Sequence, residues 1–444
     1  DGTLIEHNDF LIVPNGYDIP YQSEKIHGIS TALAKSKGES INEVLNSFKN
    51  VLAKTKVLVG QNLKFDLNIL GSEFHRLGYD NAWLKMPVLD TCTEKSAFLC
   101  KLPGGRGGKF KYPTLSELHQ CLFKKPFKDA HNATADVEAT ARCFFELIRK
   151  GSLQKSDLYL DDEKYADFFV KNTSEFSAAG IKHINLSKQS KALIEEIPSE
   201  VTKSTSPKED ISHLKDVPFS HLHNKTQFSV LQSTIHVKTL IDKAVEFGMP
   251  AVAFSDSGNM MGAFQFVETG FKHNQSIDKK IEEANENANV SEIEIQDLER
   301  KKIIPIVGCE FQVCPDRNDK TYKNNGYQVP FLAKNKKGYQ NLIKLSSIGF
   351  IEGFYYVPRI DKNIILEYSN DLIVTSGGLY GEIAQLILNE GEQKAEQALI
   401  WWKENFKDDF YLEINRHSLE EEEKVNEVLL RFAKKYSIKY FASN

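Results

Sequence analysis

Three side chains in the first third of the chain have types that suit metal-assisted phosphoryl chemistry. Asp66 lies in "GQNLKFDLNIL", whereas His131 and Asp136 lie in "HNATADVEAT". Carboxylate oxygens hold Mg²⁺ or Mn²⁺, and two such ions about 4 Å apart stabilise both the attacking and the leaving oxygen of a phosphodiester. A histidine near its ordinary pKa can take a proton from the attacking water. Together the three residues suit hydrolysis of a phosphoester.

Taken one at a time, these residues also have simpler explanations. An aspartate in a first helical turn, such as Asp136, is usually a cap or a partner of the helix dipole. A histidine in a loop, such as His131, usually has no catalytic role. The residues between them, Ala133 to Ala135, are small and leave room beside the site.

Alternating strands and helices must position these side chains. Residues 57–61 and 86–91 are apolar runs of strand length, and residues 1–16 are typical of a hairpin. Apolar residues at three- and four-residue steps predict the buried faces of two helices: Leu63, Leu67, Leu70, Phe74 and Leu77 in the first, and Val137, Ala141, Phe144, Leu147 and Ile148 in the second, which ends at Gly151. The pattern predicts an α/β layer fold for residues 1–150.

Composition excludes several classes of protein. The 444 residues are 41% hydrophobic and 26% charged, which is typical of a globular protein with two or three domains. The net charge of −5 excludes a generally basic nucleic-acid coat, so contacts with a polyanion need local patches. The six cysteines form no CxxC pair and indicate a reducing compartment. Without a membrane-spanning run or signal peptide, we expect a cytoplasmic location.

Beyond residue 150 the alternation of strand-like and helix-like segments ends. Residues 151–212 are polar and broken by proline, and they predict a linker with one or two short helices. A second α/β domain is expected over 213–444, with helices near 234–247 and 261–272 and strands at 250–256 and 302–314. Residues 276–302 are highly charged and predict a helical insertion exposed to solvent.

The motifs of residues 1–150 resemble the DEDDh 3′→5′ exonucleases that proofread DNA. The resemblance rests on "VGQNLKFDLNIL", "PVLDT", "TLSELHQCLF" and "HNATADVEATARCFFELI", in that order. It implies a ribonuclease-H-like fold with a mixed sheet, two divalent metals (Mg²⁺ or Mn²⁺) and catalytic roles for three residues. Asp66 and Asp136 match metal ligands of the second and third motifs, and His131 matches the general base. "EKIHGIS" (24–30) resembles the segment near the terminal nucleotide, and Gln61 replaces a frequent histidine.

The first motif of that family, an Asp-x-Glu on the first strand, should lie upstream of Asp1. Both ends of the sequence look cut, because it opens on Asp1 in a strand-like stretch and closes on "KYFASN". We therefore expect a fragment truncated at both ends, and we expect residues 1–444 alone to lack nuclease activity.

The loop "KLPGGRGGKFKYP" (101–113) is not a phosphate-binding P-loop. Pro103 stands where the first glycine of GxxxxGK[ST] belongs, and Phe110 replaces the Ser/Thr. Two interpretations stay open: a basic loop beside a DNA strand, whose lysines and Arg106 suit phosphates, and an ordinary surface loop.

The second domain resembles the PHP domain of bacterial polymerase III alpha subunits, an α/β barrel. The resemblance rests on "SHLHNKTQFSVLQ", "AVAFSDSGNMMGAFQF", "GCEFQV", "LAKNKKGYQNL" and "VTSGGLYGEI". Intact PHP domains hold a metal cluster suited to phosphoester hydrolysis. His223 and Glu310 match two ligand positions. Other residues stand at five further ligand positions: Lys225, Gln232, Ser257, Gln328 and Gly378. The last Asp-x-His pair of ligands is expected beyond Asn444.

Lys225 is the most informative of these replacements. A protonated lysine cannot bind a metal, and its charge can fill the place of a cation. We therefore expect a PHP site without metal, whose former ligand positions His223 and Glu310 keep polar contacts and a structural role. His221 lies outside the ligand register, and His417 is interpreted as a strand-end residue.

The order of the domains resembles alpha subunits that carry an exonuclease fused at the N-terminus. The resemblance implies a DNA-directed DNA polymerase, a nucleotidyltransferase of DNA replication, whose polymerase active site lies downstream of residue 444. It implies DNA with a single-stranded 3′ end or a primer–template as partner, together with a sliding clamp and clamp-loader subunits, and no membrane. Two alternatives remain: a stand-alone DNA-processing exonuclease with a PHP scaffold, and a non-catalytic docking segment of the replisome.

Overall fold

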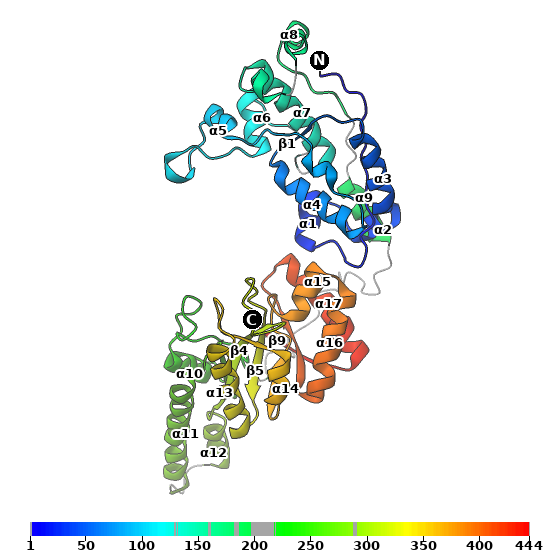
Figure 1. The fold of residues 1–444 in the computed structure, drawn as a ribbon. Helices are drawn as coiled ribbons and strands as arrows, with labels where there is room; N and C mark the ends of the chain where they lie inside the picture. The colour runs from blue at the N-terminus through cyan, green and yellow to red at the C-terminus, as the bar shows by residue number, and fades with distance from the viewer. Residues whose placement is uncertain are drawn as a thin grey trace. The chain divides into compact units, whose positions relative to one another are not determined.

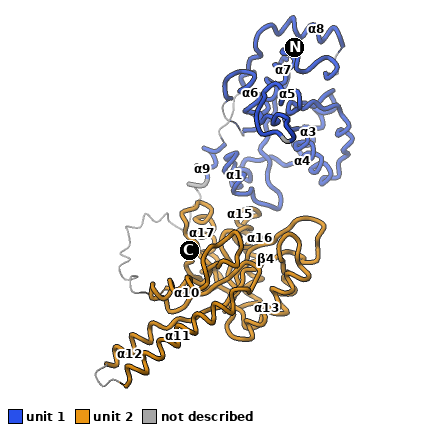
Figure 2. Tube along the Cα trace, turned by 90° about the vertical axis from the view of Figure 1, so that its left-hand side faces the viewer, with its two compact units in different colours: residues 1–198 blue, residues 199–444 orange. Residues whose placement is uncertain are grey.

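The computed structural model divides into two compact units, residues 1–198 and residues 199–444 (Figure 2). It describes residues 2–127, 130, 132–158, 161–181, 186–196, 217, 219–286 and 291–443. None of the helices in these ranges combines the length and the apolar character that a bilayer crossing requires. Each unit mixes helices with a β-sheet, as the sequence predicts.

Unit 1 builds helices around a two-stranded parallel sheet (Figure 1). Its elements are α1 (Tyr21–His27), α2 (Thr31–Lys37), α3 (Ile41–Leu52), β1 (Leu58–Gly60), α4 (Leu63–Arg76), η1 (Ala82–Lys85), β2 (Val88–Asp90), α5 (Glu94–Cys100), η2 (Arg106–Gly108), α6 (Leu115–Phe123), α7 (Ala133–Arg149), η3 (Lys155–Asp157), α8 (Asp162–Lys171) and α9 (Leu186–Glu196). The predicted strands at 57–61 and 86–91 are confirmed as β1 and β2. Their register pairs Gly60 with Asp90, so the carboxyl ends of both strands lie side by side.

The hairpin predicted for residues 1–16 does not form. Within residues 2–16, which the structure describes, only Ile12 makes a β-bridge, and its partner is Glu39. The amide of Val13 donates to the carbonyl of Glu39 at 3.0 Å, and the amide of Glu39 donates to the carbonyl of Leu11 at 2.7 Å. Glu39, which follows α2, thus pairs with backbone groups of Leu11 and Val13 that a hairpin would have paired within the segment.

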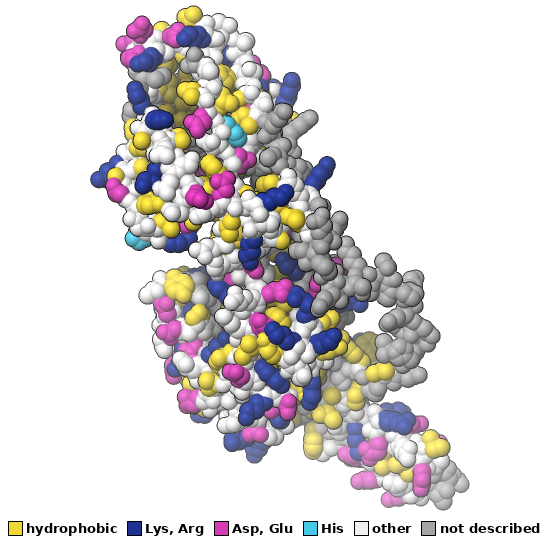
Figure 3. Space-filling model, turned by 90° about the vertical axis from the view of Figure 1, so that its right-hand side faces the viewer, with side chains coloured by type: hydrophobic (Ala, Val, Ile, Leu, Met, Phe, Trp, Pro, Cys, Tyr) yellow, Lys and Arg dark blue, Asp and Glu magenta, His cyan; other side chains and the backbone are white. Residues whose placement is uncertain are grey.

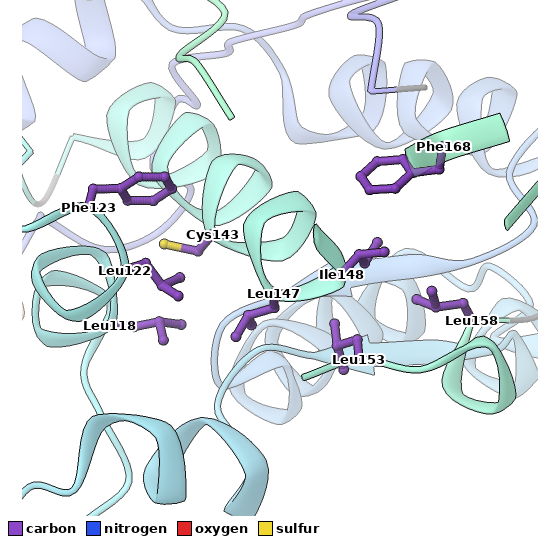
Figure 4. Close-up of a cluster of buried hydrophobic side chains, with 9 residues drawn as sticks. All are labelled: Leu118, Leu122, Phe123, Cys143, Leu147, Ile148, Leu153, Leu158 and Phe168. Atoms are coloured by element: carbon purple, nitrogen blue, oxygen red, sulfur yellow. The ribbon is translucent and has the colours of Figure 1, made fainter. Parts of the chain in front are cut away.

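The main core of unit 1 lies between α6, α7 and α8 (Figure 4). It consists of Leu118, Leu122, Phe123, Cys143, Leu147, Ile148, Leu153, Leu158 and Phe168. The predicted apolar face of α7 is partly wrong, because Val137 is 60% exposed and Ala141 is exposed as well. Ala135 and Ala139 are buried instead. Alanine suits this face because α7 packs directly on β1, where larger side chains would hold the two elements apart.

Unit 1 continues well into the stretch predicted as a linker, 151–212. Phe168 of α8 belongs to the core, and the ring of Phe176 stacks on Phe145 with centroids 4.7 Å apart. The Ser190 hydroxyl of α9 accepts from the amide of Ser30 at 3.0 Å and donates to a carbonyl before α2. Aromatic packing by Phe168 and Phe176 thus attaches α8 and the segment after it to unit 1, and the hydrogen bonds of Ser190 attach α9. The rest of the expected linker, 197–212, lies outside the described residues.

Unit 2 is built on a seven-stranded mixed sheet with the order β3-β4-β5-β7-β8-β9, in which β6 pairs with β4. Its elements are α10 (Val237–Glu246), β3 (Ala251–Ser257), α11 (Ala263–Glu286), α12 (Glu292–Glu299), β4 (Ile304–Cys314), β5 (Tyr327–Ala333), α13 (Lys336–Ile351), β6 (Arg359–Asp361), α14 (Lys362–Glu367), β7 (Leu372–Thr375), α15 (Glu382–Asn389), α16 (Glu392–Phe406), η5 (Lys407–Asp409), β8 (Phe410–Asn415), α17 (Glu420–Tyr436) and β9 (Lys439–Ser443). Strand β5 runs antiparallel to both of its neighbours, β4 and β7, and the other pairs are parallel.

The described residues of the charged stretch 276–302 include the end of α11 and all of α12, and these two helices pack side by side at the edge of unit 2 (Figure 1). The helix predicted near 261–272 therefore runs further than expected, to Glu286. Ile277 is buried between the helices, and the Lys302 ammonium lies 2.7 Å from carboxylates of both Asp278 and Glu299.

On the face of the molecule in Figure 3, basic and acidic side chains are interspersed with apolar ones, without one continuous basic surface.

Candidate functional site

The first candidate site lies where β1 passes into α4. Asn62 adopts a left-handed conformation (φ 59°) that turns the chain from strand to helix. The carboxylate of Asp90, at the end of β2, accepts from the amides of Asn62 at 2.9 Å and Leu63 at 2.8 Å. Asp90 thereby satisfies amides at the N-terminus of α4 that no intrahelical carbonyl can reach. Asp66 follows in the first turn of this helix.

The environment of Asp66 differs from that of an ordinary surface carboxylate. Partial burial raises its pKa, a hydrogen bond from its own backbone opposes this, and the negative charge of Asp90 raises the pKa further. Sequence reasoning missed Asp90 as part of this site. The available signal was an acid directly after a strand that runs parallel to the strand preceding Asp66.

Asp136 lies in the first turn of α7, as predicted. The Asn132 side chain caps this helix by accepting from the amide of Ala135 at 3.3 Å. The buried Thr134 hydroxyl donates to the Asp9 carboxylate at 2.7 Å, which ties the start of α7 to the N-terminal segment. His131, the predicted base, lies outside the described residues.

The helices that carry the two predicted metal ligands adjoin the same strand. α4 follows β1 in the chain, and α7 packs on β1. The carboxylates of Asp66 and Asp136 are hard oxygen ligands, which suit Mg²⁺ or Mn²⁺. Their convergence on one metal pair stays a prediction.

The second candidate site lies in unit 2, where His223 bridges two buried carboxylates. Its Nδ1 lies 2.9 Å from Oε1 of Glu413, on β8, and its Nε2 lies 3.1 Å from Oε2 of Glu310, on β4. The side chains of Glu310 and Glu413 are 3% and 0% exposed. The Thr375 hydroxyl, at the end of β7, donates to the second Glu413 oxygen at 3.1 Å. Side chains from β4 and β8 thus contact the imidazole, and one from β7 supports Glu413.

Lys225 extends this network toward solvent. Its ammonium lies 2.8 Å from Oε1 of Glu310 and donates to Oε1 of Gln232 at 2.9 Å. The Ser257 hydroxyl lies 2.8 Å from the same Gln232 oxygen and 3.3 Å from Oε1 of Glu310. Three of the five residues at expected ligand positions, Lys225, Gln232 and Ser257, are therefore joined in one network with Glu310.

A buried aspartate supports the loop that holds His223 and Lys225. Asp256, at the end of β3, is fully buried and accepts from the amide and the hydroxyl of Thr226, both at 2.6 Å. It also accepts from the Ser229 hydroxyl at 2.7 Å. A buried carboxylate with three donors acts as a hub for backbone geometry, so Asp256 orients this loop.

The pKa values of the network indicate a set of ion pairs. Burial lowers the pKa of His223, but the hydrogen bonds to Glu310 and Glu413 outweigh it and raise the pKa to about 10. Burial favours the neutral forms of both glutamates, yet His223 holds their pKa values below the ordinary range, with help from Lys225 at Glu310. Two cations thus balance two buried carboxylates.

This arrangement does not fit a PHP metal cluster. A protonated imidazole has both ring nitrogens occupied by hydrogen, so His223 offers no lone pair to a metal. The Lys225 ammonium already pairs with Oε1 of Glu310 at 2.8 Å, so the positive charge that a metal would supply to this carboxylate comes from a side chain. Across the described ranges, no set of three or more His, Cys, Asp or Glu side chains gathers as a metal-binding group.

The remaining predicted replacements have separate surroundings. The backbone amide of Gln328 donates to the backbone carbonyl of Tyr380 at 2.9 Å. Gly378 lies against Asn415, because a Cβ atom on this glycine would lie 3.3 Å from the Asn415 amide nitrogen. At this position a larger side chain would press on the end of β8.

His221 and His417 lie apart from the network, as expected. The His221 ring packs edgewise on Phe219, with centroids 4.9 Å apart. His417 follows the end of β8, and its Nδ1 lies 2.6 Å from the Glu422 carboxylate. Its amide also donates to the same carboxylate, so His417 anchors the start of α17.

Glu413 is the functional-site residue that sequence reasoning missed in unit 2. It lies in "FYLEIN", an otherwise apolar strand in which a fully buried acid requires a partner. That interruption was the available signal, but the partner, His223, lies 190 residues earlier in the chain.

Two families match parts of this chain. Residues 2–144 match the exonuclease family, and residues 221–417 match the PHP domain family. The chain therefore combines an exonuclease domain of ribonuclease-H-like fold with a PHP domain. A metal-dependent phosphoesterase from Bifidobacterium adolescentis has 12% identity and a TM-score of 0.30 over 51% of this chain and 87% of its own. That score is too low to establish a shared fold.

The curated relatives are DNA polymerase III alpha subunits, which match over the PHP region. The protein from Chlamydia trachomatis is 33% identical over 248 residues, and that from Borreliella burgdorferi is 32% identical over 232 residues. The Aquifex aeolicus protein is 33% identical over 234 residues. These alignments cover about half of this chain and 18% of each relative, so the chain spans less than a fifth of the proteins it resembles.

Proposed function

We propose that this chain is part of a replicative DNA polymerase III alpha subunit that carries its own proofreading exonuclease. In this proposal unit 1 removes nucleotides from a DNA 3′ end, and unit 2 is a structural PHP domain without metal. One observation carries it: a single chain matches the exonuclease family in its first half and resembles polymerase III alpha subunits in its second. DNA synthesis, a sliding clamp and clamp-loader subunits are then functions and partners of the whole protein.

In the exonuclease site, Asp66 and Asp136 hold Mg²⁺ or Mn²⁺, and His131 acts as general base. The bound ions supply charge stabilisation to the attacked phosphodiester. Asp90 fixes the start of α4 and thereby the direction of Asp66. Asn132 and Thr134 fix the start of α7 and thereby the position of Asp136. His131 accepts the proton of the attacking water through a neutral ring nitrogen.

The exonuclease proposal is tested on the whole gene product with a primer–template whose 3′ end is mismatched. Asp66→Asn and Asp136→Asn should abolish excision, and His131→Gln should slow it by about 10²-fold or more. Glu163→Gln, a change of an exposed acid in α8, serves as the matched control. Primer extension from a paired end should continue in all four variants. Excision at the control rate in Asp66→Asn or Asp136→Asn would refute the assignment.

In the PHP unit, the ion-pair network takes the place of a metal cluster. Its support is the contact of Lys225 and His223 with the two buried glutamates. Because each charge in the network has an opposite partner, the network can hold β4 and β8 together without a metal ion. Its function in this proposal is to stabilise the sheet.

The same preparations distinguish the alternatives. A whole protein that excises nucleotides but does not extend primers would favour a stand-alone DNA-processing exonuclease with a PHP scaffold. A protein that does neither, yet binds other replication proteins, would favour a docking role. Nucleotide incorporation that persists when unit 1 carries Asp66→Asn supports the polymerase assignment.

A further inference from the structure

We propose that unit 1 carries a second DNA contact, an aromatic platform that binds single-stranded DNA beside the exonuclease site. The platform consists of Phe98 on α5 and of Phe110 and Tyr112 in the loop 101–113. It would stack unpaired bases, while neighbouring lysines contact the phosphates. The proposal rests on the exonuclease function proposed above and names a surface that the catalytic residues do not include.

The three rings are unusually exposed for aromatic side chains. Phe98 is 67% exposed, Tyr112 is 50% exposed and Phe110 is 39% exposed. Phe98 and Phe110 contact each other edge to face, with centroids 6.1 Å apart. All three line a hollow of about 750 Å³ between α5 and the loop. Grouped exposed aromatic side chains are typical of binding surfaces.

The charge around these rings suits a polyanion. The loop 101–113 contains four basic residues and no acidic one, in a chain whose net charge is −5. The Lys101 ammonium lies 5.7 Å from the centroid of the Phe98 ring. The ammonium groups of Lys109 and Lys111 lie 2.5 and 2.7 Å from Glu94 and Glu117. Such exposed ion pairs contribute little to stability, so phosphates can replace the carboxylates.

Several contacts tie the platform to the helix that carries Asp66. The Gln61 side chain, which directly precedes the α4 cap, donates to the carbonyl of Pro113 at 2.8 Å. The Cys92 thiol lies 3.6 Å from the same carbonyl. The Lys111 amide donates to the carbonyl of Leu102 at 3.0 Å and closes the loop on itself. The base of the loop is therefore held next to the start of α4.

The combination of rings and lysines favours a single strand over other occupants. Every base has an aromatic face, so stacking on phenylalanine and tyrosine tolerates any sequence, and lysines follow the backbone charge. Paired bases in a duplex cannot stack on these rings without unpairing. A 3′ end that has separated from its template presents the free bases that this surface accepts.

The test is fluorescence anisotropy of a labelled single-stranded oligothymidine that is titrated with the whole gene product. EDTA is present to prevent cleavage. Phe98→Ala and Tyr112→Ala should each weaken binding by about tenfold. Phe98→Tyr keeps an aromatic ring and should bind as tightly as the unsubstituted protein. Phe247→Ala is the matched control, because Phe247 in unit 2 is also 67% exposed and has a lysine 5.9 Å away. Unchanged thermal midpoints verify folding.

The outcomes separate the platform from the proposed exonuclease. If Phe98→Ala and Tyr112→Ala bind the oligothymidine with the same affinity as Phe247→Ala, the platform proposal is wrong. The exposed rings would then favour a protein as the occupant of this surface. In the whole protein, Asp66→Asn should fail to excise nucleotides from a 3′ end in Mg²⁺, an outcome that tests the proposed function alone. If Asp66→Asn still excises, the proposed function fails whether or not the platform variants lose binding.

Discussion

The Lys225 ammonium lies 2.8 Å from the carboxylate of Glu310, a residue that the sequence predicts at a PHP ligand position. Glu310 is 3% exposed, whereas Lys225 is 23% exposed, so the pair lies at the boundary between the core and solvent. His223 supplies the second cation and Glu413 the second anion. The network keeps the charge balance of a metal site without offering ligands to a metal.

We expect Lys225→Met to destabilise unit 2 by about 2 kcal/mol, because it removes one cation from a largely buried carboxylate. The measurement is the midpoint of the unit 2 transition in urea. Lys238→Met is the matched control, since Lys238 is 72% exposed and pairs with Asp242 within one helix. Its effect should stay below about 0.5 kcal/mol. Equal effects of the two changes would show that the Lys225–Glu310 contact stabilises unit 2 no more than an exposed ion pair does.

The stability of unit 2 should fall as the pH rises from about 7 to 10. The folded pKa of His223, about 10, lies above its ordinary value of 6.5. Its stabilising contribution is therefore complete below the unfolded pKa and disappears as the pH rises through the folded pKa. Urea midpoints between pH 6 and 10 measure this slope. His223→Gln should flatten it, whereas His236→Gln, at an exposed position, should leave it unchanged.

The parts of the fold that the sequence predicted are those with strong periodicity. β1, β2 and β4 follow from apolar runs, and the insertion 276–302 follows from its charge. The buried face of α7 was misplaced because Ala135 and Ala139 carry little hydrophobic signal, although small side chains are what a close helix–strand contact requires. The hairpin at 1–16 failed because pairing with Glu39 is not visible in local sequence.

The candidate sites were predictable only where a motif marks the residue. Lys225, Gln232 and Ser257 were identified by position, but their mutual contacts depend on how three strands meet. Glu413 carries no motif signal of its own, whereas Asp90 lies within "PVLDT", to which sequence reasoning assigned no role in the site. Each belongs to its site through strand register or through a partner far away in the chain, which single-sequence reasoning does not reach.

Metal removal should affect the two units differently. EDTA should abolish excision by the whole protein, because Asp66 and Asp136 act through a divalent ion. It should leave the thermal midpoint of unit 2 unchanged, because His223 and Lys225 already neutralise Glu310 and Glu413. An excision assay measures the first effect. Calorimetry before and after dialysis, with metal analysis of the dialysed protein, measures the second. A lower midpoint that zinc restores, together with bound zinc lost in His223→Gln, would contradict the ion-pair site.

Asp90→Asn should shift the acid limb of the excision pH profile to lower pH. The negative charge of Asp90 raises the pKa of Asp66, so its removal lets Asp66 ionise, and hold metal, in more acidic solution. The asparagine keeps one side-chain oxygen for the α4 amides, which limits the loss of the cap. Profiles of kcat/KM against pH for the whole protein measure the shift.

Asp80→Asn is the matched control for this change. Asp80 also accepts a backbone amide, from Ala82 at 3.0 Å, but its charge is not among the causes that shift the pKa of Asp66. Its variant should follow the wild-type profile. If Asp90→Asn loses rate equally at every pH, Asp90 acts only as a cap for α4. If both variants shift alike, the Asp90 charge has no specific effect on Asp66, because any lost carboxylate in unit 1 would do the same.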